Sequence, residues 1–91
     1  MKSRRLKQFK QAFAKLPQDI RERSRQRFRQ FLKNPNNPSF HVKLVQATRR
    51  WTRPHWEYRI DTNYRATCFH DADTAVWVFI GNHDEFEQFY S

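Results

Sequence analysis

Residues 56–80 read WEYRIDTNYRATCFHDADTAVWVFI. Apolar and polar residues alternate through most of this stretch, which is the period-two pattern of half-buried strands. Polar clusters at 61–63 and 71–73 interrupt the pattern with residues that favour tight turns. The last seven residues, 74–80, are apolar on both sides of the chain, as in a strand that is covered on both faces. The stretch therefore predicts three consecutive strands, of which the third is central.

Upstream of this stretch, apolar residues recur at helical spacing in two segments. The first segment has an N-cap candidate in Ser3 and ends at Pro17, and the second ends in the Pro- and Asn-rich turn at 34–38. Residues 40–44 then alternate between apolar and polar and predict one more strand. The two helical stripes are Leu6, Phe9, Phe13 and Leu16, followed by Ile20, Phe28, Phe31 and Leu32, with Ser24 between them.

The length of the loop at 61–63 decides which side chains share a face of the sheet. A three-residue loop pairs Arg59 with Arg65 and places both, with Thr67, on the face away from the helices. A two-residue loop would bury Arg65 without a partner, which is costly, so the longer loop is preferred. Asn63 is able to adopt a positive φ in this loop. The helix-packed face would then hold Trp56, Tyr58, Ala66 and Cys68.

These elements predict an α+β fold, with two N-terminal antiparallel helices packed on one face of a four-stranded, mainly antiparallel sheet. The 91 residues allow a single domain, 1–91. The lone cysteine, Cys68, excludes a disulfide within the chain, and the lone glycine, Gly81, excludes a glycine-rich phosphate loop. No apolar run approaches the ~18 residues of a membrane helix, and no secretory apolar block opens the chain. We therefore expect a cytoplasmic protein with no membrane partner.

The formal net charge of +9 is unevenly distributed. Residues 1–50 carry 15 Lys and Arg against 2 acidic residues, whereas residues 51–91 carry 3 against 7. This asymmetry predicts a positive surface that binds a polyanion such as nucleic acid. The alternative for the basic helices is a solvated face without a ligand, and the alternative for Trp51 is packing within its loop. The candidate nucleic-acid-binding residues are Arg21, Arg25 and Arg29 on the second helix, with Arg49, Arg50, Arg53 and Trp51 in the loop that interleaves cations with an aromatic ring.

Two arginines side by side on an open sheet face repel each other and usually indicate an anion that both contact. Arg59 and Arg65 meet this description, and Lys43 on the neighbouring segment and His83 just beyond the central strand extend the group. Cleavage of RNA through its own 2′-hydroxyl needs cations that stabilise charge on the phosphate and a group that titrates near neutral pH. These four residues are therefore the candidate catalytic residues, and no cofactor is expected.

Other interpretations of these residues stay open. The two sheet arginines could instead pair with Glu57 or Asp61, and His83 could serve as a polar cap at the end of its strand. Asp71 and Asp73 flank a turn, where Asp is common for backbone reasons, and the histidines show no metal-ligand spacing. No metal site is predicted.

From Leu6 to about Phe89 the sequence resembles the RelE/ParE toxin superfamily of bacterial toxin–antitoxin systems. This resemblance implies a microbial-RNase-like sheet whose basic concave face is turned to RNA. In the RelE branch it implies metal-independent cleavage of mRNA in the ribosomal A site. The matching segments are Lys15-Leu16-Pro17, the turn at 34–39, Lys43-Leu44, Tyr58-Arg59-Ile60, Asn63-Tyr64-Arg65-Ala66, and residues 77–80 running into 81–86.

The resemblance also assigns roles to individual residues. The family's basic strand residue matches Lys43 or Arg59, its Tyr-Arg arginine matches Arg65, and its strand-end His or Arg matches His83. Two features differ from the usual pattern. The family usually opens with a full strand, whereas only a few residues precede the first helix here. The family's terminal Tyr appears in register as Phe86, with Tyr90 four residues later.

The resemblance therefore predicts a type II toxin, a ribosome-dependent mRNA endoribonuclease that inhibits translation. Its partners would be mRNA in the ribosomal A site and a cognate antitoxin, which is expected to be acidic and partly disordered and to fold on the basic surface. Two alternatives remain open at this point. One is a ParE-like toxin that binds DNA gyrase and has no RNase site, and the other is a catalytically degenerate relative that binds RNA or an antitoxin.

Overall fold

The computed structural model describes all residues from Met1 to Ser91 and shows an α+β fold built on one five-stranded sheet. The strand order is β1-β5-β4-β3-β2, with β1 parallel to β5 and the other neighbours antiparallel. The strands are β1 (Lys2–Arg5), β2 (Lys43–Leu44), β3 (Trp56–Arg59), β4 (Tyr64–Asp71) and β5 (Thr74–Asn82). The helices are α1 (Lys7–Ala14), α2 (Gln18–Lys33) and α3 (His83–Phe89), with 3-10 turns η1 (Pro38–Phe40) and η2 (Gln46–Thr48).

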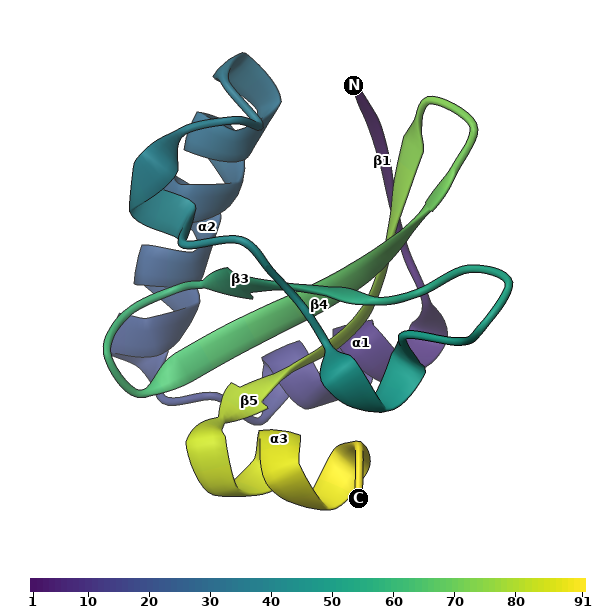
Figure 1. Ribbon diagram of the computed structural model, residues 1–91. Helices are drawn as coiled ribbons and strands as arrows, with labels where there is room; N and C mark the ends of the chain where they lie inside the picture. The colour runs from purple at the N-terminus through teal and green to yellow at the C-terminus, as the bar shows by residue number, and fades with distance from the viewer.

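The helices lie on different sides of the sheet. In Figure 1, α2 stands along the sheet and α3 crosses the end of β5, close to the C-terminus. The side chains of α1 and α2 form one core with the face of the sheet that carries Tyr58, Ala66 and Trp77. We call this face the inner face and the opposite one the outer face. No helix combines the length and the apolar character that crossing a membrane requires.

The number of strands is the main difference from the predicted fold, because β1 adds a fifth strand. Ser3 lies in β1 and does not cap α1; its Oγ accepts a hydrogen bond of 2.7 Å from Nε1 of Trp77. Backbone bonds from Lys2 to Asp73 and from Leu6 to Trp77, both 3.0 Å, fix β1 along β5. The strand reads KSRR and has no apolar alternation, so periodicity gave no sign of it.

The predicted register of the β3–β4 hairpin is confirmed. Arg59 faces Arg65 across the two strands, and Tyr58 faces Ala66. The loop differs in one detail, since Asn63 does not adopt a positive φ. Instead Oδ1 of Asp61 accepts hydrogen bonds from the backbone N–H groups of residues 63 and 64, at 2.8 and 2.9 Å, which closes the turn without a left-handed residue.

Aromatic rings dominate the core between the helices and the inner face. Phe31 of α2 lies 5.2 Å from Trp77 and 5.4 Å from Tyr58, both edge to face, and Phe40 of η1 packs 5.8 Å from Tyr58. Such rings bury a large area each, which suits a chain this short. Burial also raises the pKa of the Cys68 thiol to about 12, so this residue is a packing group.

Two predicted core positions are exposed. Leu32 follows Phe31 on α2 and is 47% exposed, because a helix that buries Phe31 turns the next residue by about 100° towards solvent. Val42 is also exposed, since the predicted strand at 40–44 shortens to β2 after His41 turns the chain at φ 46°. Phe40 is still buried, although it belongs to η1 and not to a strand.

Candidate functional site

The pairing of strands arranges the outer face in rows. Residues that face each other on antiparallel strands have side chains on the same side of the sheet. One row runs across β3, β4 and β5 as Arg59, Arg65 and Gly81. The neighbouring row runs across β2 to β5 as Lys43, Glu57, Thr67 and Phe79. Three of the four predicted catalytic residues, Lys43, Arg59 and Arg65, therefore share one face, as the sequence predicted.

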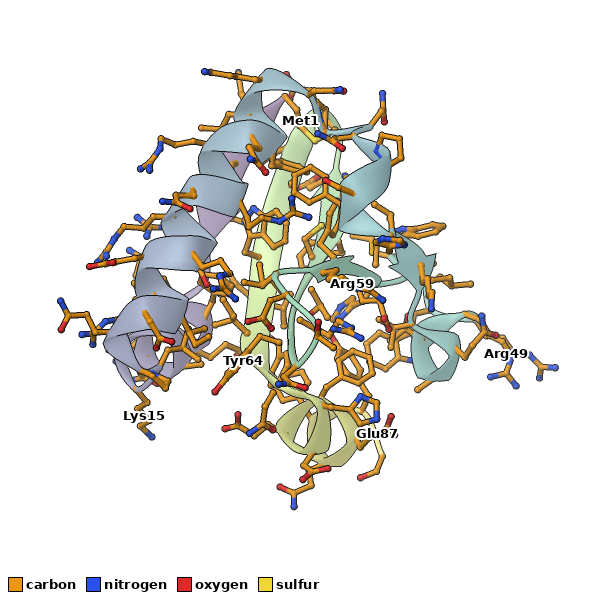
Figure 2. All side chains as sticks on the ribbon, turned by 90° about the vertical axis from the view of Figure 1, so that its left-hand side faces the viewer. Met1, Lys15, Arg49, Arg59, Tyr64 and Glu87 are labelled. Carbon is orange, nitrogen blue, oxygen red and sulfur yellow. The ribbon has the colours of Figure 1, made fainter.

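Arg59 is the exceptional residue of this face. Its guanidinium makes no ion pair and donates no hydrogen bond within the chain, and its Nε is buried without any partner. Arg59 extends from β3 near the middle of the molecule (Figure 2). A cationic guanidinium without an acceptor is costly when its Nε is buried. Its two terminal nitrogens also lack a partner in the chain but are not buried, so they are the groups that an acceptor from outside the chain can reach. The alternative prediction, pairing with Glu57 or Asp61, does not hold for Arg59.

Arg65 is held much more firmly than its neighbour. Its Nη1 donates to the backbone oxygen of Asp61 at 3.0 Å and lies 3.3 Å from those of Thr62 and Tyr64. Its Nε lies 3.6 Å from Oε1 of Glu57, and both side chains are mostly buried. Arg65 thus forms the ion pair with Glu57 that was the alternative interpretation of this residue. It also places a second positive charge directly beside Arg59.

His83 begins α3, at the edge of this face. Asn82 caps the helix, because its side chain accepts from the N–H of Glu85 at 2.9 Å while Oε1 of Glu85 accepts from the N–H of Asn82 at 2.9 Å. The imidazole of His83 is 65% exposed, and its Nε2 lies 3.6 Å from Oε1 of Glu87, one turn along the same helix. It makes no hydrogen bond or ion pair with the three cations of the sheet.

Tyr90, which sequence reasoning did not include among the site residues, reaches the outer face from the end of α3. Its phenol oxygen lies 2.6 Å from Oγ1 of Thr67 and 2.9 Å from Nδ1 of His55. Burial, opposed by the bond to Thr67 and helped by Cys68 and Glu57, raises the pKa of Tyr90 to about 12. Burial lowers the pKa of His55. At neutral pH this cluster is therefore uncharged.

The aromatic packing around the cluster explains why Tyr90 reaches this place. The His55 ring stacks on Phe69 at 5.6 Å and meets Tyr90 edge to face at 5.7 Å. Phe86, at the position of the family's tyrosine, packs against Phe79 at 6.2 Å. Tyr90 follows Phe86 by four residues, one helical turn, so both project from the same side of the helix. That spacing is the sequence signal that identifies Tyr90.

The predicted nucleic-acid-binding residues lie in two separate places. Arg21, Arg25 and Arg29 belong to α2, in the helix layer behind the inner face. The loop after η2 carries Arg49, Arg50, Trp51 and Arg53 and leads into His55, beside the outer face. Figure 2 shows Arg49 at the opposite side of the molecule from Lys15, which follows α1.

The candidate nucleic-acid-binding residues of this loop include an exposed ring, Trp51, and a side chain held by neighbouring residues, Arg53. Trp51 is 52% exposed, and its ring edge meets His55 at 5.1 Å. Arg53 lies 3.5 Å from Asp71 and 6.0 Å above the ring of Phe69. Trp51 thus extends the aromatic surface that starts at Tyr90 and His55, in a form that a nucleotide base can stack on.

A cavity lies against the inner face of the sheet. This cavity of about 180 Å³ opens between the helices and the sheet, and most of its lining is apolar, including Phe13, Phe28 and Trp77. Arg5 and Arg25 also line it, both exposed and neither in an ion pair with a carboxylate. No group of three or more His, Cys, Asp or Glu side chains is placed to hold a metal ion.

A helical pair on one face of a mostly antiparallel five-stranded sheet is also the fold of solved RelE toxins. A RelB–RelE antitoxin–toxin complex from Methanococcus jannaschii matches with a TM-score of 0.74 and 15% identity, over 97% of this chain and 99% of that one. A RelE–RelB complex from Pyrococcus horikoshii OT3 matches with a TM-score of 0.69 and 14% identity, over 89% and 92%.

A copper-bound mutant toxin from Helicobacter pylori matches with a TM-score of 0.61 and 19% identity, over 93% of this chain and 97% of that one. No protein-family model matches the sequence, and no curated protein matches it. The fold that the RelE/ParE resemblance implied is therefore confirmed, including the strand before the first helix that the sequence had not revealed.

Proposed function

We propose that this protein is the toxin of a type II toxin–antitoxin system and cleaves mRNA in the ribosomal A site. The observation that carries the proposal is the Arg59 guanidinium, which has no acceptor in the chain although its Nε is buried. A phosphate bound there gains a second cation in Arg65, which faces Arg59 across the hairpin. Phosphate is the acceptor that paired guanidinium groups match best.

The proposed reaction uses the RNA's own 2′-hydroxyl. A base removes the hydroxyl proton, the 2′-oxygen forms a bond to phosphorus, and the bond from phosphorus to the 5′-oxygen breaks. An acid gives its proton to that leaving oxygen, so the products are a 2′,3′-cyclic phosphate and a 5′-hydroxyl. Arg59, Arg65 and Lys43 stabilise the charge that develops on the phosphate.

Two groups are proposed for the proton transfers. Tyr90 is the acid, because its raised pKa keeps it protonated and the leaving alkoxide is a stronger base than a phenolate. His83 is the base, as its place at the end of β5 suggested from the sequence. Trp51 and the arginines of its loop would hold the neighbouring nucleotides by stacking and phosphate contacts.

Mapping RNA 5′ ends after addition of the protein to ribosomes programmed with a defined mRNA tests this function. We expect cuts in the A-site codon that carry 5′-hydroxyls, and loss of cutting in Arg59→Gln and Tyr90→Phe. Arg4→Gln is the matched control and should cut normally, because Arg4 is exposed on β1, which is separated from β3 by two strands. DNA damage without RNA cuts would instead support a gyrase-binding toxin.

A catalytically degenerate relative is the second candidate, and Phe86 favours it, because Phe has no proton to give at the position of the family's tyrosine. It predicts binding of RNA or antitoxin, no cuts, and no growth arrest on expression. The decisive comparison is Tyr90→Phe against wild type. Absence of RNA cuts and of growth arrest in both proteins would support the degenerate relative.

The proposed partner is an acidic antitoxin, supported by the net charge of +9 and by the inner cavity. The cavity is wide enough for one large apolar side chain, and carboxylates beside that side chain would meet Arg5 and Arg25. Ser24→Leu fills the cavity and should weaken a complex with an acidic peptide that carries one large apolar side chain at least tenfold. Gln26→Leu, exposed on the same helix, should leave that complex intact.

A further inference from the structure

Two side chains from distant parts of the chain meet at the phenol oxygen of Tyr90. Thr67 Oγ1 approaches from β4 at 2.6 Å and Nδ1 of His55 from the segment before β3 at 2.9 Å. Thr67 is fully buried and His55 is nearly so. The hydroxyl of Tyr90 is thus fixed from two sides, although the residue lies next to the C-terminus.

The number of hydrogen atoms on these three side chains limits which of them can donate in the two hydrogen bonds. Tyr90 has one hydroxyl hydrogen, and Thr67 has another. His55 carries one ring hydrogen when neutral, on either Nδ1 or Nε2. Arg59 Nε is the only buried side-chain nitrogen or oxygen without a partner, so Nε2 of His55, which has no partner in the chain, is in contact with solvent. Water can therefore satisfy Nε2 whether or not it carries the hydrogen, and Nδ1 is free to carry it.

We propose that His55 is a positioning residue that prepares Tyr90 to give up its proton, by donating its Nδ1–H to the phenol oxygen together with the hydroxyl of Thr67. This inference rests on the proposed function and deepens it. With both neighbours donating, the hydroxyl hydrogen of Tyr90 is free to point at a bound substrate. When that hydrogen passes to the leaving 5′-oxygen, the phenolate left behind already accepts two hydrogen bonds.

The surroundings show why such help is needed. Glu57 of β3, on the same face, opposes ionisation of Tyr90, and so does Cys68 of β4 from the inner side of the sheet. The cation nearest to His55 along its loop is Arg53, which is engaged with Asp71 and Phe69. Arg65 is engaged with Glu57. Only His55 and Thr67 hydrogen-bond to the phenol oxygen, so neutral donors are what the structure places on a phenolate at this position.

The tautomer of His55 provides a test that does not depend on nuclease activity. Long-range ¹H–¹⁵N spectra of the full chain, with ¹⁵N-labelled histidine, report which ring nitrogen carries the hydrogen. We expect Nδ1–H in wild type at pH 7.5 and a changed Nδ1 shift in Tyr90→Phe, with the other three histidines unaffected. A ring protonated on Nε2 alone would overturn the proposal, whether or not the protein cuts RNA.

Kinetics provide the second test, with variants that keep the packing. His55→Phe retains the ring but loses the N–H, and we expect kcat to fall about tenfold or more with little change in KM. His55→Asn restores a donor at the position of Nδ1 and should recover most of the rate. His41→Asn is the control, because His41 is exposed and its φ of 46° suits Asn.

Two comparisons separate positioning from mere stabilisation of the fold. In the Tyr90→Phe background, His55→Phe should cause no further loss of rate, since it acts only through Tyr90. An RNA with a bridging 5′-sulfur needs no acid, because a thiolate leaves unprotonated, so both single variants should cleave it at the wild-type rate. Slow cleavage of this RNA by His55→Phe, or additive losses in the double variant, would contradict the proposal. If wild type cuts neither RNA, the proposed function fails, and the tautomer spectra alone decide this inference.

Discussion

The guanidinium of Arg27 donates two hydrogen bonds to the backbone carbonyl oxygen of Arg59, from Nη2 at 3.1 Å and from Nε at 3.4 Å. The same Nη2 also donates to the carbonyl of Ser39 at 2.8 Å, and the guanidinium lies 4.4 Å above the ring of Phe40. Helix α2 therefore fixes the strand that carries the unpartnered arginine, from the opposite side of the sheet. One arginine supports the backbone of another whose side chain is left free for an outside anion.

Replacement of Arg27 should therefore destabilise the protein as a whole. Arg27→Met keeps much of the apolar contact with Phe40 but leaves two carbonyl oxygens without their charged donor. Hydrogen bonds to charged groups contribute about 1.5–3 kcal/mol, so we expect the free energy of unfolding to fall by about 2 kcal/mol. Denaturant unfolding followed by circular dichroism measures this. Arg29→Met, exposed on the same helix, should change stability by less than about 0.5 kcal/mol, and an equal loss in both variants would contradict the assignment.

Arg59 should respond in the opposite direction. Arg59→Met removes a half-buried cation that has no acceptor and that repels Arg65, so stability should rise by about 1 kcal/mol. For a domain of this size that corresponds to about 4–8 °C in Tm. RNA binding and cutting should be lost in the same variant. A lower Tm would show that Arg59 has a stabilising partner after all.

Binding of RNA should depend steeply on salt. Each phosphate contact to a single strand contributes about 0.7 to the slope of log affinity against log salt concentration. We expect Arg59→Gln to reduce the slope for a short single-stranded RNA by about 0.7, measured by fluorescence anisotropy between low and physiological salt. Arg4→Gln should leave the slope unchanged. A wild-type slope near zero would contradict the electrostatic basis of the site.

Much of the fold could be predicted from the sequence because its strongest signals are local. The pairing of Arg59 with Arg65 followed from alternation and from the length of one loop. Strand β1 could not be predicted in this way, since its four residues are polar and its pairing with β5 joins positions more than 70 residues apart, as the bond from Trp77 to Ser3 does. Leu32 was predicted to be buried because apolar residues at helical spacing do not show how wide the buried face of the helix is.

The site was predictable only in part, for a similar reason. Lys43, Arg59 and Arg65 share a face because strand geometry requires it. The contacts of Tyr90 depend on how α3 crosses the sheet, which no periodicity encodes. The engagement of Arg65 by its own loop is likewise a matter of side-chain geometry. The sequence thus identified the cationic residues of the outer face but not Tyr90, whose hydroxyl group lies on that face.

The close fit of α3 on the outer face should make Gly81 intolerant of even a methyl group. A Cβ at this position would lie 2.8 Å from Cζ of Phe79 and 3.1 Å from Oε1 of Glu85, which closes the helix cap. We expect Gly81→Ala to cost about 1–3 kcal/mol, measured by thermal unfolding, and to reduce RNA cutting by displacing Tyr90. Gln88→Ala, exposed on the same helix, is the control. Because Gly→Ala in an open strand is normally stabilising, a more stable Gly81→Ala protein would contradict this packing.

The stability of the protein should depend on pH through His55. Burial lowers the pKa of His55 below its ordinary value of 6.5 in the folded state, whereas in the unfolded chain it returns to about that value. Between the two values the unfolded state binds more protons, so stability is complete above pH 6.5 and is lost as pH falls through the folded-state pKa. Denaturant unfolding between pH 5 and 7.5 should show this fall in wild type and in His41→Asn. His55→Phe, which cannot be protonated, should flatten the curve over that range, and an unchanged slope would assign the effect to another group.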